Sequence, residues 1–533
     1  MELDKDIRST QEVRDLVAKA KSAQLEFKHF NQTQVDKIVK AMADAGFEAS
    51  EKLAKMAHQE TGFGKWEDKV IKNQFGSRTV YESIKDLKTV GVIDVQKNGK
   101  IVHIAEPMGV VAALIPSTNP TSTAFFKALI SLKTRNSIVA SPHPKAVMCT
   151  SEALKIMDEA AVSAGAPRGL IQCMSTPTLE GTEALMKHKD VGVILATGST
   201  PMVKAAYSAG TPAYGVGSGN VPAFIERTAN YEKAVLDIIY GTTFDNGTLC
   251  SSEQAMIVDR PISEKAKKFA EENGGYFVCS SEKEKLEKAV LKDGRINPEI
   301  VGKSAQFIAN YSGFSVPETT KVLLAECLKV GKDEPLSMEK LSPILAYYIV
   351  DGWLDGCHKC IELLNFGGVG HTMSIHSSDQ DIIMKFAMEK PAFRIIVNSP
   401  SSLGAVGYTT ALDPSMTLGV GTWGGSIISE NVTAKHLMNI KTLAFEVNPI
   451  NKGASVNTLG NTQTNNSLNS GGSFINQIED RLRARAGNPV VSNFAPKKDF
   501  IPPATNNNNS SQKTLGAGIS EEEVKKIIRE FNS

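Results

Sequence analysis

Four short apolar runs decide the fold: Gly109-Val-Val-Ala-Ala-Leu-Ile115, Ser137-Ile-Val-Ala140, Leu170-Ile-Gln-Cys173 and Val191-Gly-Val-Ile-Leu195. Each run has the length and the composition of a buried strand. Helical segments such as Ser151–Ala164 lie between the runs. Apolar strands that alternate with helices predict a parallel sheet covered on both faces. The stretch 107–226 is therefore predicted to be an α/β unit.

A second α/β stretch follows from residue 230 to about residue 398, with apolar runs at 255–258, 344–350 and 394–397. The first ninety residues have helical patterns, and the capping-box spacing of Ser9 and Glu12 predicts a helix start there. Between these parts, Asn98-Gly99 separates two β-rich runs, which predicts a hairpin at about 90–105. The globular body is thus predicted to hold two α/β domains and a hairpin.

Composition excludes several classes of protein. The chain has 533 residues, of which 41% are hydrophobic and 22% are charged, with a formal net charge of +1. This balance argues against nucleic-acid binding, which uses a basic surface. No apolar run approaches the roughly 20 residues of a membrane span, and the acidic N-terminus does not resemble a signal peptide. The seven cysteines are few and odd in number, so we expect free thiols, a reducing compartment and a cytoplasmic protein.

The composition changes after about Ile450, where Asn, Ser, Gly and Thr dominate. Such sequence buries too little apolar surface to fold alone, so 451–518 is predicted to be a disordered linker. Two amphipathic islands lie in this tail, at 474–485 and 519–533. In the second, Val524, Ile527, Ile528 and Phe531 form one apolar stripe.

Cys250 is the one cysteine with the flanks of a reactive thiol. It lies in the polar loop Phe244-Asp-Asn-Gly-Thr-Leu-Cys-Ser-Ser-Glu253, between a predicted helix and a predicted strand. A nucleophilic thiol needs partial exposure and stabilisation of its thiolate, whereas a structural cysteine is usually buried among apolar residues. The local sequence leaves both interpretations open.

Two further polar residues are candidates on weaker signals. Asn119 ends an apolar strand between Pro116 and Pro120, where its amide could stabilise an oxyanion or simply form a turn. His371 follows a glycine-rich stretch and could act as an acid, a base or a ligand group, or be an ordinary loop histidine. Gly419–Gly424 matches G-x-G-x-x-G without the strand and helix that give the pattern meaning. Cys357 and Cys360 have no second cysteine pair, so we predict a helix and no metal site.

Taken together and in order, the motifs of residues 1–450 resemble the aldehyde dehydrogenase superfamily, and more closely its coenzyme A-acylating branch of the bacterial microcompartment propionaldehyde/acetaldehyde dehydrogenase type. The motifs are Glu60-Thr-Gly62, Glu106-Pro-Met-Gly-Val110, Ile115-Pro-Ser-Thr-Asn-Pro120, Ser141-Pro-His-Pro144, Ala196-Thr-Gly-Ser199, Gly215-Val-Gly-Ser-Gly-Asn-Val-Pro222, Asn246-Gly-Thr-Leu-Cys-Ser-Ser-Glu253, Glu339-Lys-Leu-Ser-Pro343, Gly367–His371 and Gly419-Val-Gly-Thr-Trp-Gly-Gly425.

The resemblance implies a role for each motif residue. Cys250 matches the nucleophile, which forms a thiohemiacetal and then a thioester. Asn119 matches the oxyanion-hole amide, assisted by the Cys250 backbone N–H, and His371 matches a histidine near the nucleophile. The implied NAD-binding residues, with NADP left open, are Thr197, Gly198 and Ser199 at the pyrophosphate, Glu339 at the nicotinamide ribose, Ser141, Pro142 and His143 at the adenosine ribose, and Gly217.

Two departures from the family pattern carry information. Val216 stands where hydrolytic relatives have the Glu that activates the deacylating water. Without a general base, water attack on a thioester is slow, which favours coenzyme A as the acyl acceptor. Val203 replaces the last glycine of the cofactor loop Gly198-Ser-x-x-x-Gly, which indicates a loosely held dinucleotide that can leave before coenzyme A enters.

The resemblance also implies an architecture and partners. We expect an NAD-binding domain at 1–226, a catalytic domain at 227–426, and an oligomerisation arm made by the hairpin and 427–450, giving a homodimer or homotetramer. Residues 519–533 would be an encapsulation helix that docks on microcompartment shell proteins, with 474–485 as the competing segment and the compartment lumen as the location. A short helix of this kind needs a partner to bury its stripe.

The expected reaction converts a short-chain aldehyde, NAD⁺ and coenzyme A into acyl-CoA and NADH. Propanal, acetaldehyde and lactaldehyde all remain open as substrates. Two alternatives are a hydrolytic aldehyde dehydrogenase that releases a free acid, and a shell-binding adaptor whose dehydrogenase body is inactive.

Overall fold

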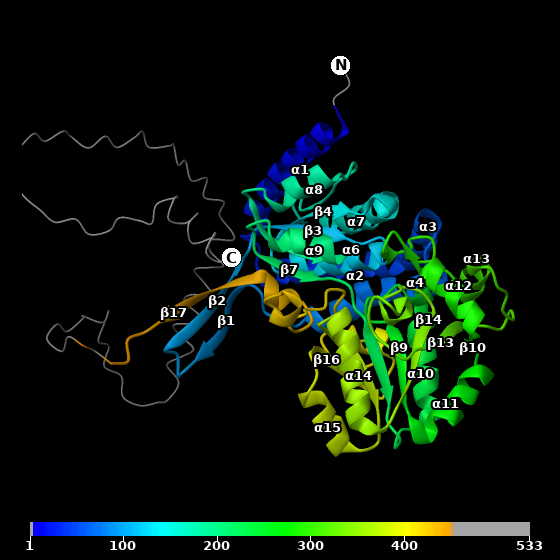
Figure 1. Ribbon diagram of the computed structural model, residues 1–533. Helices are drawn as coiled ribbons and strands as arrows, with labels where there is room; N and C mark the ends of the chain where they lie inside the picture. Colours follow the sequence, from blue (N-terminus) through cyan, green and yellow to red (C-terminus); the bar gives the residue numbers. More distant parts are fainter. Residues whose placement is uncertain (1–3, 449, 451–533) are drawn as a thin grey trace, which may run out of the picture. The chain divides into compact units, whose positions relative to one another are not determined.

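The computed structural model describes residues 4–448 and residue 450 (Figure 1). Both predicted tail islands, at 474–485 and 519–533, lie outside the described residues. The N-terminal helices are α1 (Lys5–Phe27), α2 (Gln32–Glu48), α3 (Ser50–Thr61), α4 (Trp66–Gln74), the π-helix η1 (Phe75–Thr79) and α5 (Val80–Ile84). Among the described residues, no helix is long and apolar enough to span a bilayer.

The first α/β unit contains a five-stranded parallel sheet in the order β5-β4-β3-β6-β7. Its strands are β3 (Val110–Ile115), β4 (Ser137–Pro142), β5 (Ile171–Cys173), β6 (Val191–Thr197) and β7 (Ala213–Val216). The intervening helices are α6 (Pro120–Lys133), the 3-10 turn η2 (Pro144–Ala146), α7 (Val147–Ser163), α8 (Leu179–Met186) and α9 (Thr200–Tyr207). Every strand predicted for this region is present, and the all-parallel arrangement is confirmed.

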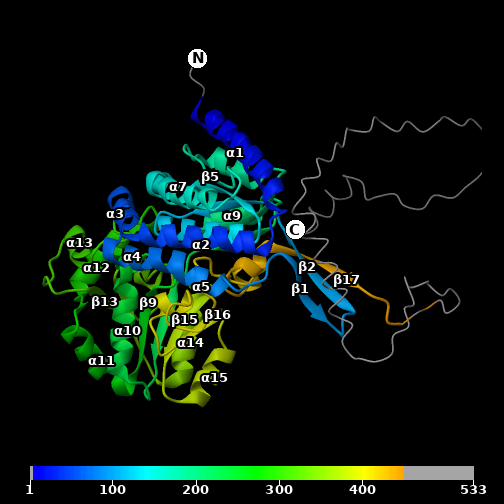
Figure 2. The same ribbon diagram turned by 180° about the vertical axis from the view of Figure 1, so that it is seen from behind.

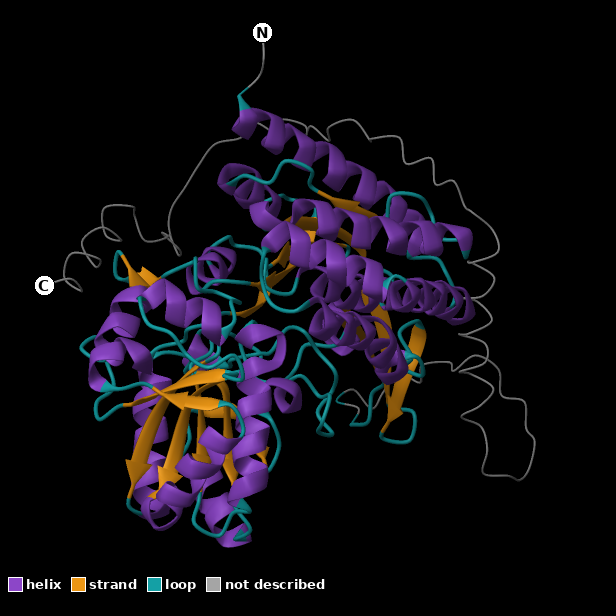
Figure 3. Cartoon of the chain, turned by 90° about the vertical axis from the view of Figure 1, so that its right-hand side faces the viewer, coloured by secondary structure: helices purple, strands orange, loops and turns teal. Residues whose placement is uncertain are grey.

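The alternation of side chains along β3 explains why helices cover both faces of this sheet. Val111, Ala113 and Ile115 pack with α2, α6 and α7 in one core. The intervening residues of β3 pack with α1, α8 and α9 in another. Because both faces are buried, the strand is apolar at every position, as in other parallel sheets. Figure 3 shows helices on both sides of the strands.

The second α/β unit contains a seven-stranded parallel sheet in the order β10-β13-β14-β9-β8-β15-β16. Its strands are β8 (Val221–Ile225), β9 (Glu253–Asp259), β10 (Gly275–Phe277), β13 (Val322–Glu326), β14 (Ile344–Val350), β15 (Gly370–His376) and β16 (Ala392–Val397). Its helices are α10 (Tyr231–Thr243), α11 (Arg260–Glu272), α12 (Ser280–Val290), α13 (Ala305–Ser312), α14 (Gly352–Phe366), α15 (Gln380–Met388) and α16 (Ser401–Ala405). Short elements complete it: η3 (Phe244–Gly247), η4 (Pro335–Ser337), and the strand pair β11 (Leu291–Lys292) and β12 (Arg295–Ile296).

A three-stranded antiparallel sheet joins the predicted hairpin to a strand more than 300 positions later in the chain. It consists of β1 (Gly91–Gln96), β2 (Ile101–Pro107) and β17 (Met438–Ala444) in the order β1-β2-β17. The hairpin is confirmed, but its turn is longer than the two residues that Asn98-Gly99 predicted. Gln96 pairs with Ile101, which leaves four residues in the loop, and Lys97, Asn98 and Gly99 have φ of 50°, 54° and 81°. Figure 2 shows this small sheet beside the two larger ones.

Sheet membership departs from the predicted domain boundaries in two places. Strand β8 lies inside 1–226 but joins the second sheet, between β9 and β15. Residues 427–437, predicted to belong to the oligomerisation arm, instead bring Ile428, Val432 and Leu437 into the core of the first unit. The 3-10 turns η5 (Thr422–Gly424) and η6 (Ala434–Leu437) lie in this returning segment. In both places the chain passes from one α/β unit to the other. The local sequence pattern does not mark where such a crossing occurs.

The predicted helix start at Ser9 is wrong. Helix α1 begins at Lys5, and the side chain of Asp4 accepts the backbone N–H of Asp6 as its N-cap. Ser9 is buried inside the helix, and Glu12 instead accepts the N–H of Ser175 at 2.7 Å. The local spacing matched a capping box, but Asp4, an acidic residue five positions earlier, was already available for the cap.

Candidate active site

A cavity of about 870 Å³ opens at the carboxyl ends of the first sheet and is closed from the other side by loops of the second unit. Its lining includes the last residues of β3, β4, β6 and β7. Ligands of open α/β sheets bind at this edge. Of the predicted site residues, all except His371 line the cavity: Asn119, Ser141, Pro142, His143, Thr197, Gly198, Ser199, Gly217, Cys250 and Glu339.

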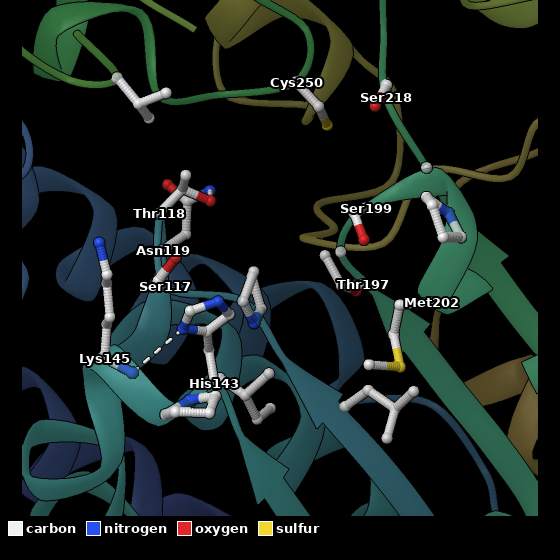
Figure 4. A pocket seen from close by; sticks show the side chains of 18 of the residues that line it. Ser117, Thr118, Asn119, His143, Lys145, Thr197, Ser199, Met202, Ser218 and Cys250 are labelled. Carbon is white, nitrogen blue, oxygen red and sulfur yellow. Dashed lines mark hydrogen bonds between the residues drawn. The ribbon is translucent and has the colours of Figure 1, made fainter. Parts of the chain in front are cut away.

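A tight turn delivers Cys250 to this cavity. Asp245, Asn246 and Gly247 in η3 all have positive φ, at 48°, 52° and 73°. The Asn246 side chain donates to the carbonyl of Gly302 at 3.0 Å, which anchors the turn to a neighbouring loop. Cys250 follows between this turn and β9, half-buried, with its side chain directed into the cavity (Figure 4).

The surroundings of Cys250 hold its thiol in the protonated form. Burial, with the Glu339 carboxylate next in importance, raises the pKa of Cys250 to about 12. The Arg394 and Lys72 cations act in the opposite direction and favour the thiolate. Arg394 itself is buried and donates to the Ser429 carbonyl at 3.1 Å. The local sequence left an exposed and a buried thiol both open. The structure shows a half-buried thiol in a setting that disfavours the thiolate.

Asn119 caps the start of α6, and its amide is held from both ends. The Nδ2 group donates to the Thr248 carbonyl at 3.3 Å and to Thr118 Oγ1 at 3.1 Å. Its Oδ1 accepts a hydrogen bond from Lys72 Nζ at 2.6 Å. Since Thr248 is two residues before Cys250, the amide N–H groups face the loop that carries the thiol.

A buried ion cluster behind Asn119 was not predicted from the sequence. Lys69 and Lys72 of α4 both contact Asp245 Oδ2, at 2.8 and 2.5 Å, and all three side chains are buried. Burial lowers the pKa of Lys72 to about 8, against the opposing effect of Asp245. Lysines three apart on a helix are usually solvated, so only the packing of α4 against η3 reveals this cluster.

The Thr197–Ser199 loop leads into the N-terminus of α9. A Cβ placed on Gly198 would meet no atom within 4 Å, so this backbone is open to the cavity. The free N–H groups of a helix start attract anions. Val203 is buried near the start of α9. Its Cγ1 packs against Gly215 so closely that a Cβ on Gly215 would lie only 2.7 Å from it. The loop can therefore approach a phosphate group, while Val203 packs against β7.

Glu339 and Gly217 lie next to this loop. Glu339 Oε1 accepts the backbone N–H of Gly219 at 2.9 Å, and burial raises the pKa of Glu339 to about 7. A Cβ on Gly217 would lie 3.2 Å from Thr200 Oγ1, so a larger residue would press on the start of α9. Among the described residues that line the cavity, Glu339 is the only carboxylate.

The end of β4 forms the far wall of the cavity. Ser141 Oγ lies 2.8 Å from Thr182 Oγ1, and Pro142 ends the strand. The side chain of the exposed His143 accepts the backbone N–H of Lys145 at 3.1 Å, the contact drawn in Figure 4. Thr197 and Ser199 approach from the opposite side in that view.

His371 lies behind the cavity wall rather than in it. Its side chain is fully buried in β15, and burial together with Arg394 lowers the pKa of His371 to about 3, so the ring is neutral. A Cβ on Gly219 would lie 3.1 Å from the His371 ring and 2.2 Å from the Cys250 carbonyl oxygen. The His371 ring and the Cys250 carbonyl therefore both border the space beside the Gly219 Cα that a side chain would fill.

The weak motifs have structural explanations. Gly419–Gly424 is a backbone-packed loop, where a Cβ on Gly419 would lie 2.5 Å from the Ile428 carbonyl oxygen. Cys357 and Cys360 are buried on α14, and Lys390 Nζ contacts Cys357 Sγ. In the described part of the chain, no three His, Cys, Asp or Glu side chains come together as metal ligands do.

The parallel sheets, with a thiol and an amide at the edge of one of them, are the arrangement that the resemblance to aldehyde dehydrogenases implied. The model of the aldehyde dehydrogenase family matches residues 6–275. The chain is 38% identical over 445 residues to the acetylating succinate-semialdehyde dehydrogenase of Clostridium kluyveri, covering 83% of this chain and 97% of that protein. The chain therefore belongs to the aldehyde dehydrogenase family, as the ordered motifs implied.

Other relatives are longer than this chain. The bifunctional aldehyde-alcohol dehydrogenase AdhE of Escherichia coli K12 is 46% identical over 444 residues, which is 82% of this chain and 50% of that protein. The chain thus spans about half the length of such curated relatives.

Solved structures agree with the fold, which is confirmed. An acetylating aldehyde dehydrogenase from Geobacillus thermoglucosidasius matches with a TM-score of 0.83 and 50% identity, over 85% of this chain and 100% of that one. A propionaldehyde dehydrogenase from a Clostridium phytofermentans fucose utilisation microcompartment matches with a TM-score of 0.74 and 29% identity, over 81% and 97%. One from Rhodopseudomonas palustris with bound propionyl-CoA matches with a TM-score of 0.73 and 29% identity, over 81% and 94%.

Proposed function

We propose that this protein converts a short-chain aldehyde, NAD⁺ and coenzyme A into acyl-CoA, NADH and a proton. The observation that carries the proposal is one cavity whose wall holds Cys250, Asn119 and the Thr197–Ser199 loop, with Glu339 as its only carboxylate among the described residues. The relatives named as acetylating support the same reaction.

The chemistry begins at Cys250. Its sulfur forms a bond to the aldehyde carbon, the carbonyl π bond opens onto oxygen, and the thiol proton passes to solvent. The Asn119 amide and the backbone N–H of Cys250 stabilise the resulting oxyanion. The Arg394 cation assists deprotonation, because it opposes the burial that raises the pKa of Cys250.

The residues present fit a dinucleotide. The open backbone of Gly198 and the start of α9 would hold a pyrophosphate, and Glu339 would accept hydrogen bonds from ribose hydroxyls. The end of β4, with Ser141, Pro142 and His143, would hold the adenosine ribose. Gly217 would also contact the dinucleotide. When bound, NAD⁺ or NADP⁺ accepts the hydride from the thiohemiacetal carbon, which leaves a thioester on Cys250.

Coenzyme A is favoured over water as the acyl acceptor because the described residues that line the cavity include one carboxylate, Glu339, which is assigned to the ribose, and none at position 216. Val216 is buried at the end of β7 and lines the cavity. Glu339 already accepts the N–H of Gly219. A thiolate needs no such base: it attacks the thioester carbon, and Cys250 leaves as the thiolate.

The test is NADH formation from propanal and NAD⁺, with and without coenzyme A, with acyl-CoA and free acid measured in parallel. Turnover only with coenzyme A, matched by propionyl-CoA, is the expected result. Equal turnover without coenzyme A, giving propionate, would replace the proposal with a hydrolytic dehydrogenase. No turnover with propanal, acetaldehyde or lactaldehyde would instead favour an inactive adaptor.

Propanal is the proposed substrate because two solved relatives at 29% identity are propionaldehyde dehydrogenases. We expect a lower KM for propanal than for acetaldehyde or lactaldehyde. Equal values for all three would restrict the proposal to short-chain aldehydes in general.

We propose further that the β1-β2-β17 sheet joins copies of the chain into a dimer or a dimer of dimers. Ile440 and Leu443 on β17 are partly exposed, at 47% and 36%. Exposed apolar side chains often mark a surface that another protein covers. Light scattering of wild type and of Ile440→Asp/Leu443→Asp measures the effect: we expect dissociation, and an unchanged mass would reject the arm.

A microcompartment location is proposed from the apolar stripe of 519–533 and from the source of one solved relative. We expect deletion of 519–533 to abolish co-purification with shell proteins and deletion of 474–485 to leave it intact. The reverse result would assign docking to the other segment, and no effect of either deletion would reject encapsulation.

A further inference from the structure

Lys72 reaches the proposed oxyanion site from outside the cavity. It lies on α4, is 4% exposed, and does not line the cavity. Its Nζ donates to Asn119 Oδ1 at 2.6 Å, to Asp245 Oδ2 at 2.5 Å and to Thr248 Oγ1 at 3.0 Å. We propose that Lys72 is a positioning residue that orients and polarises the Asn119 amide for oxyanion stabilisation. This inference rests on the proposed function.

Orientation follows from hydrogen-bond chemistry. An ammonium group has donors only, so it can be satisfied only by the oxygen of the Asn119 amide. The amide nitrogen is thereby turned toward Thr248 and Thr118, beside Cys250. Without Lys72, the amide could rotate by 180° and present its oxygen to the developing negative charge, which would repel it.

Polarisation follows from the charge. A cation at Oδ1 draws electron density from the amide and strengthens its N–H groups as donors, more so in a site shielded from water. The bond from Asn119 Nδ2 to the Thr248 carbonyl is 3.3 Å, at the long end of the normal range. This N–H is therefore weakly held and can turn to a substrate oxyanion at small cost.

The Asp245 carboxylate compensates the positive charge of the buried Lys72 ammonium. Its Oδ1 accepts the backbone N–H of Lys65 at 2.6 Å, and its own N–H donates to Asp68 Oδ2 at 2.7 Å. The charged groups that face Lys72 are thus Asp245, Asp68 and Lys69, and Asp245 favours the charged form of Lys72. The ammonium is held in place by groups that do not touch the cavity.

Lys69 offers a matched control on the same helix. It is equally buried and binds the same Asp245 oxygen at 2.8 Å, but its other contact is the Thr118 carbonyl at 3.4 Å. Lys69→Met therefore removes a buried ammonium and one contact to Asp245 while leaving the Asn119 amide bonded to Lys72. Loss of stability alone would affect both variants alike.

The experiment is a double-mutant cycle on the full chain, with kcat and KM measured under saturating coenzyme A. We expect Lys72→Met to lower kcat about 100-fold, the size of a lost oxyanion donor, with KM for the aldehyde within threefold of wild type. Lys69→Met should stay within about threefold in both constants. In an Asn119→Ala background, Lys72→Met should lower kcat less than threefold further, because its target is gone.

The outcomes separate the inference from the proposed function. The inference is overturned if Lys72→Met lowers kcat equally with and without the Asn119 side chain. It is also overturned if Lys72→Met and Lys69→Met lower kcat equally. A wild type that forms no acyl-CoA overturns the proposed function instead. Thermal melts check folding, and should Lys72→Met not fold, Lys72→Gln, whose amide can donate to Asn119 Oδ1 without a charge, takes its place in the same cycle and is expected to lose about tenfold.

Discussion

The backbone of Gly219 lies against the carbonyl of Cys250 so closely that a Cβ on Gly219 would be 2.2 Å from that oxygen. The same residue donates its N–H to Glu339. Gly219 thus couples the proposed ribose-binding carboxylate to the loop that carries the thiol, and space there exists only for glycine.

Gly219→Ala should therefore displace Cys250 while leaving the fold intact. We expect kcat to fall about 100-fold, as misplacement of a reacting group by about 1 Å does. Gly367→Ala is the matched control, because its Cβ would meet only Asn220 Cβ at 3.5 Å. Steady-state kinetics and thermal melts measure both variants. A Gly219→Ala protein with normal kcat would show that the Cys250 loop adapts without loss.

Val216→Glu should convert part of the turnover to hydrolysis. A carboxylate at the end of β7 can act as the missing general base, so we expect coenzyme A-independent NADH formation to rise about 100-fold. Val216→Gln has the same size without the base and should stay near wild type in that assay. If the two variants behave alike, the absence of a carboxylate at this position does not explain the choice of acceptor.

Alkylation of Cys250 in the free protein should depend steeply on pH. Because burial raises the pKa of Cys250 to about 12, the thiolate fraction grows about tenfold for each pH unit across pH 7–9. Mass spectrometry of the Cys250 peptide after short iodoacetamide treatment measures the rate and excludes labelling at the exposed Cys279. A plateau below pH 9 would contradict a raised pKa.

Asp245→Asn should destabilise the protein more than removal of a surface charge. It leaves Lys69 and Lys72 buried without their shared anion, which costs about 3 kcal/mol or more. Asp44→Asn breaks exposed pairs with Lys40 and Arg78 and should cost far less, because water and salt screen such pairs. Urea unfolding compares the two. Equal losses would mean that water enters the cluster and screens it.

Stability should also fall in acid through Asp245. Burial alone would raise its pKa, but Lys69 and Lys72 outweigh burial and lower it below 3.8. The folded pKa is therefore below the unfolded one, so this contribution is complete above the unfolded pKa and is lost as pH falls through the folded pKa. Urea midpoints between pH 6 and pH 2 should drop less in Asp245→Asn than in wild type. Parallel pH curves would contradict this.

Val203→Ala tests whether this residue loosens the dinucleotide. Its side chain packs over Gly215, so truncation should allow the start of α9 to settle and tighten NAD⁺ binding, at a stability cost of about 2 kcal/mol. Fluorescence titration with NADH measures affinity. An unchanged dissociation constant would separate Val203 from cofactor release.

The fold was predictable to the extent that local patterns report burial. The run 109–115 is apolar at every position because both faces of β3 are covered. Asn98 and Gly99 marked the hairpin because both adopt the positive φ that a turn needs, although the loop also includes Lys97 and Lys100. Ser9 was wrong as a helix start because Asp4, earlier in the chain, already supplies the N-cap, so the helix begins before Ser9. The placement of β8 and of 427–437 depends on long-range pairing, which leaves no local signal.

The sequence by itself determined the family, the parallel α/β architecture and which polar residues end the strands, since strand ends at one edge of a parallel sheet must meet. Only the tertiary structure decided that Lys72 holds Asn119, that His371 is buried beside Gly219 and does not line the cavity, and that burial keeps Cys250 protonated. The physical reason is that a side chain's charge, pKa and partner depend on what packs around it, and the residues from α4, η3 and β15 that meet here are up to about 300 positions apart in the chain.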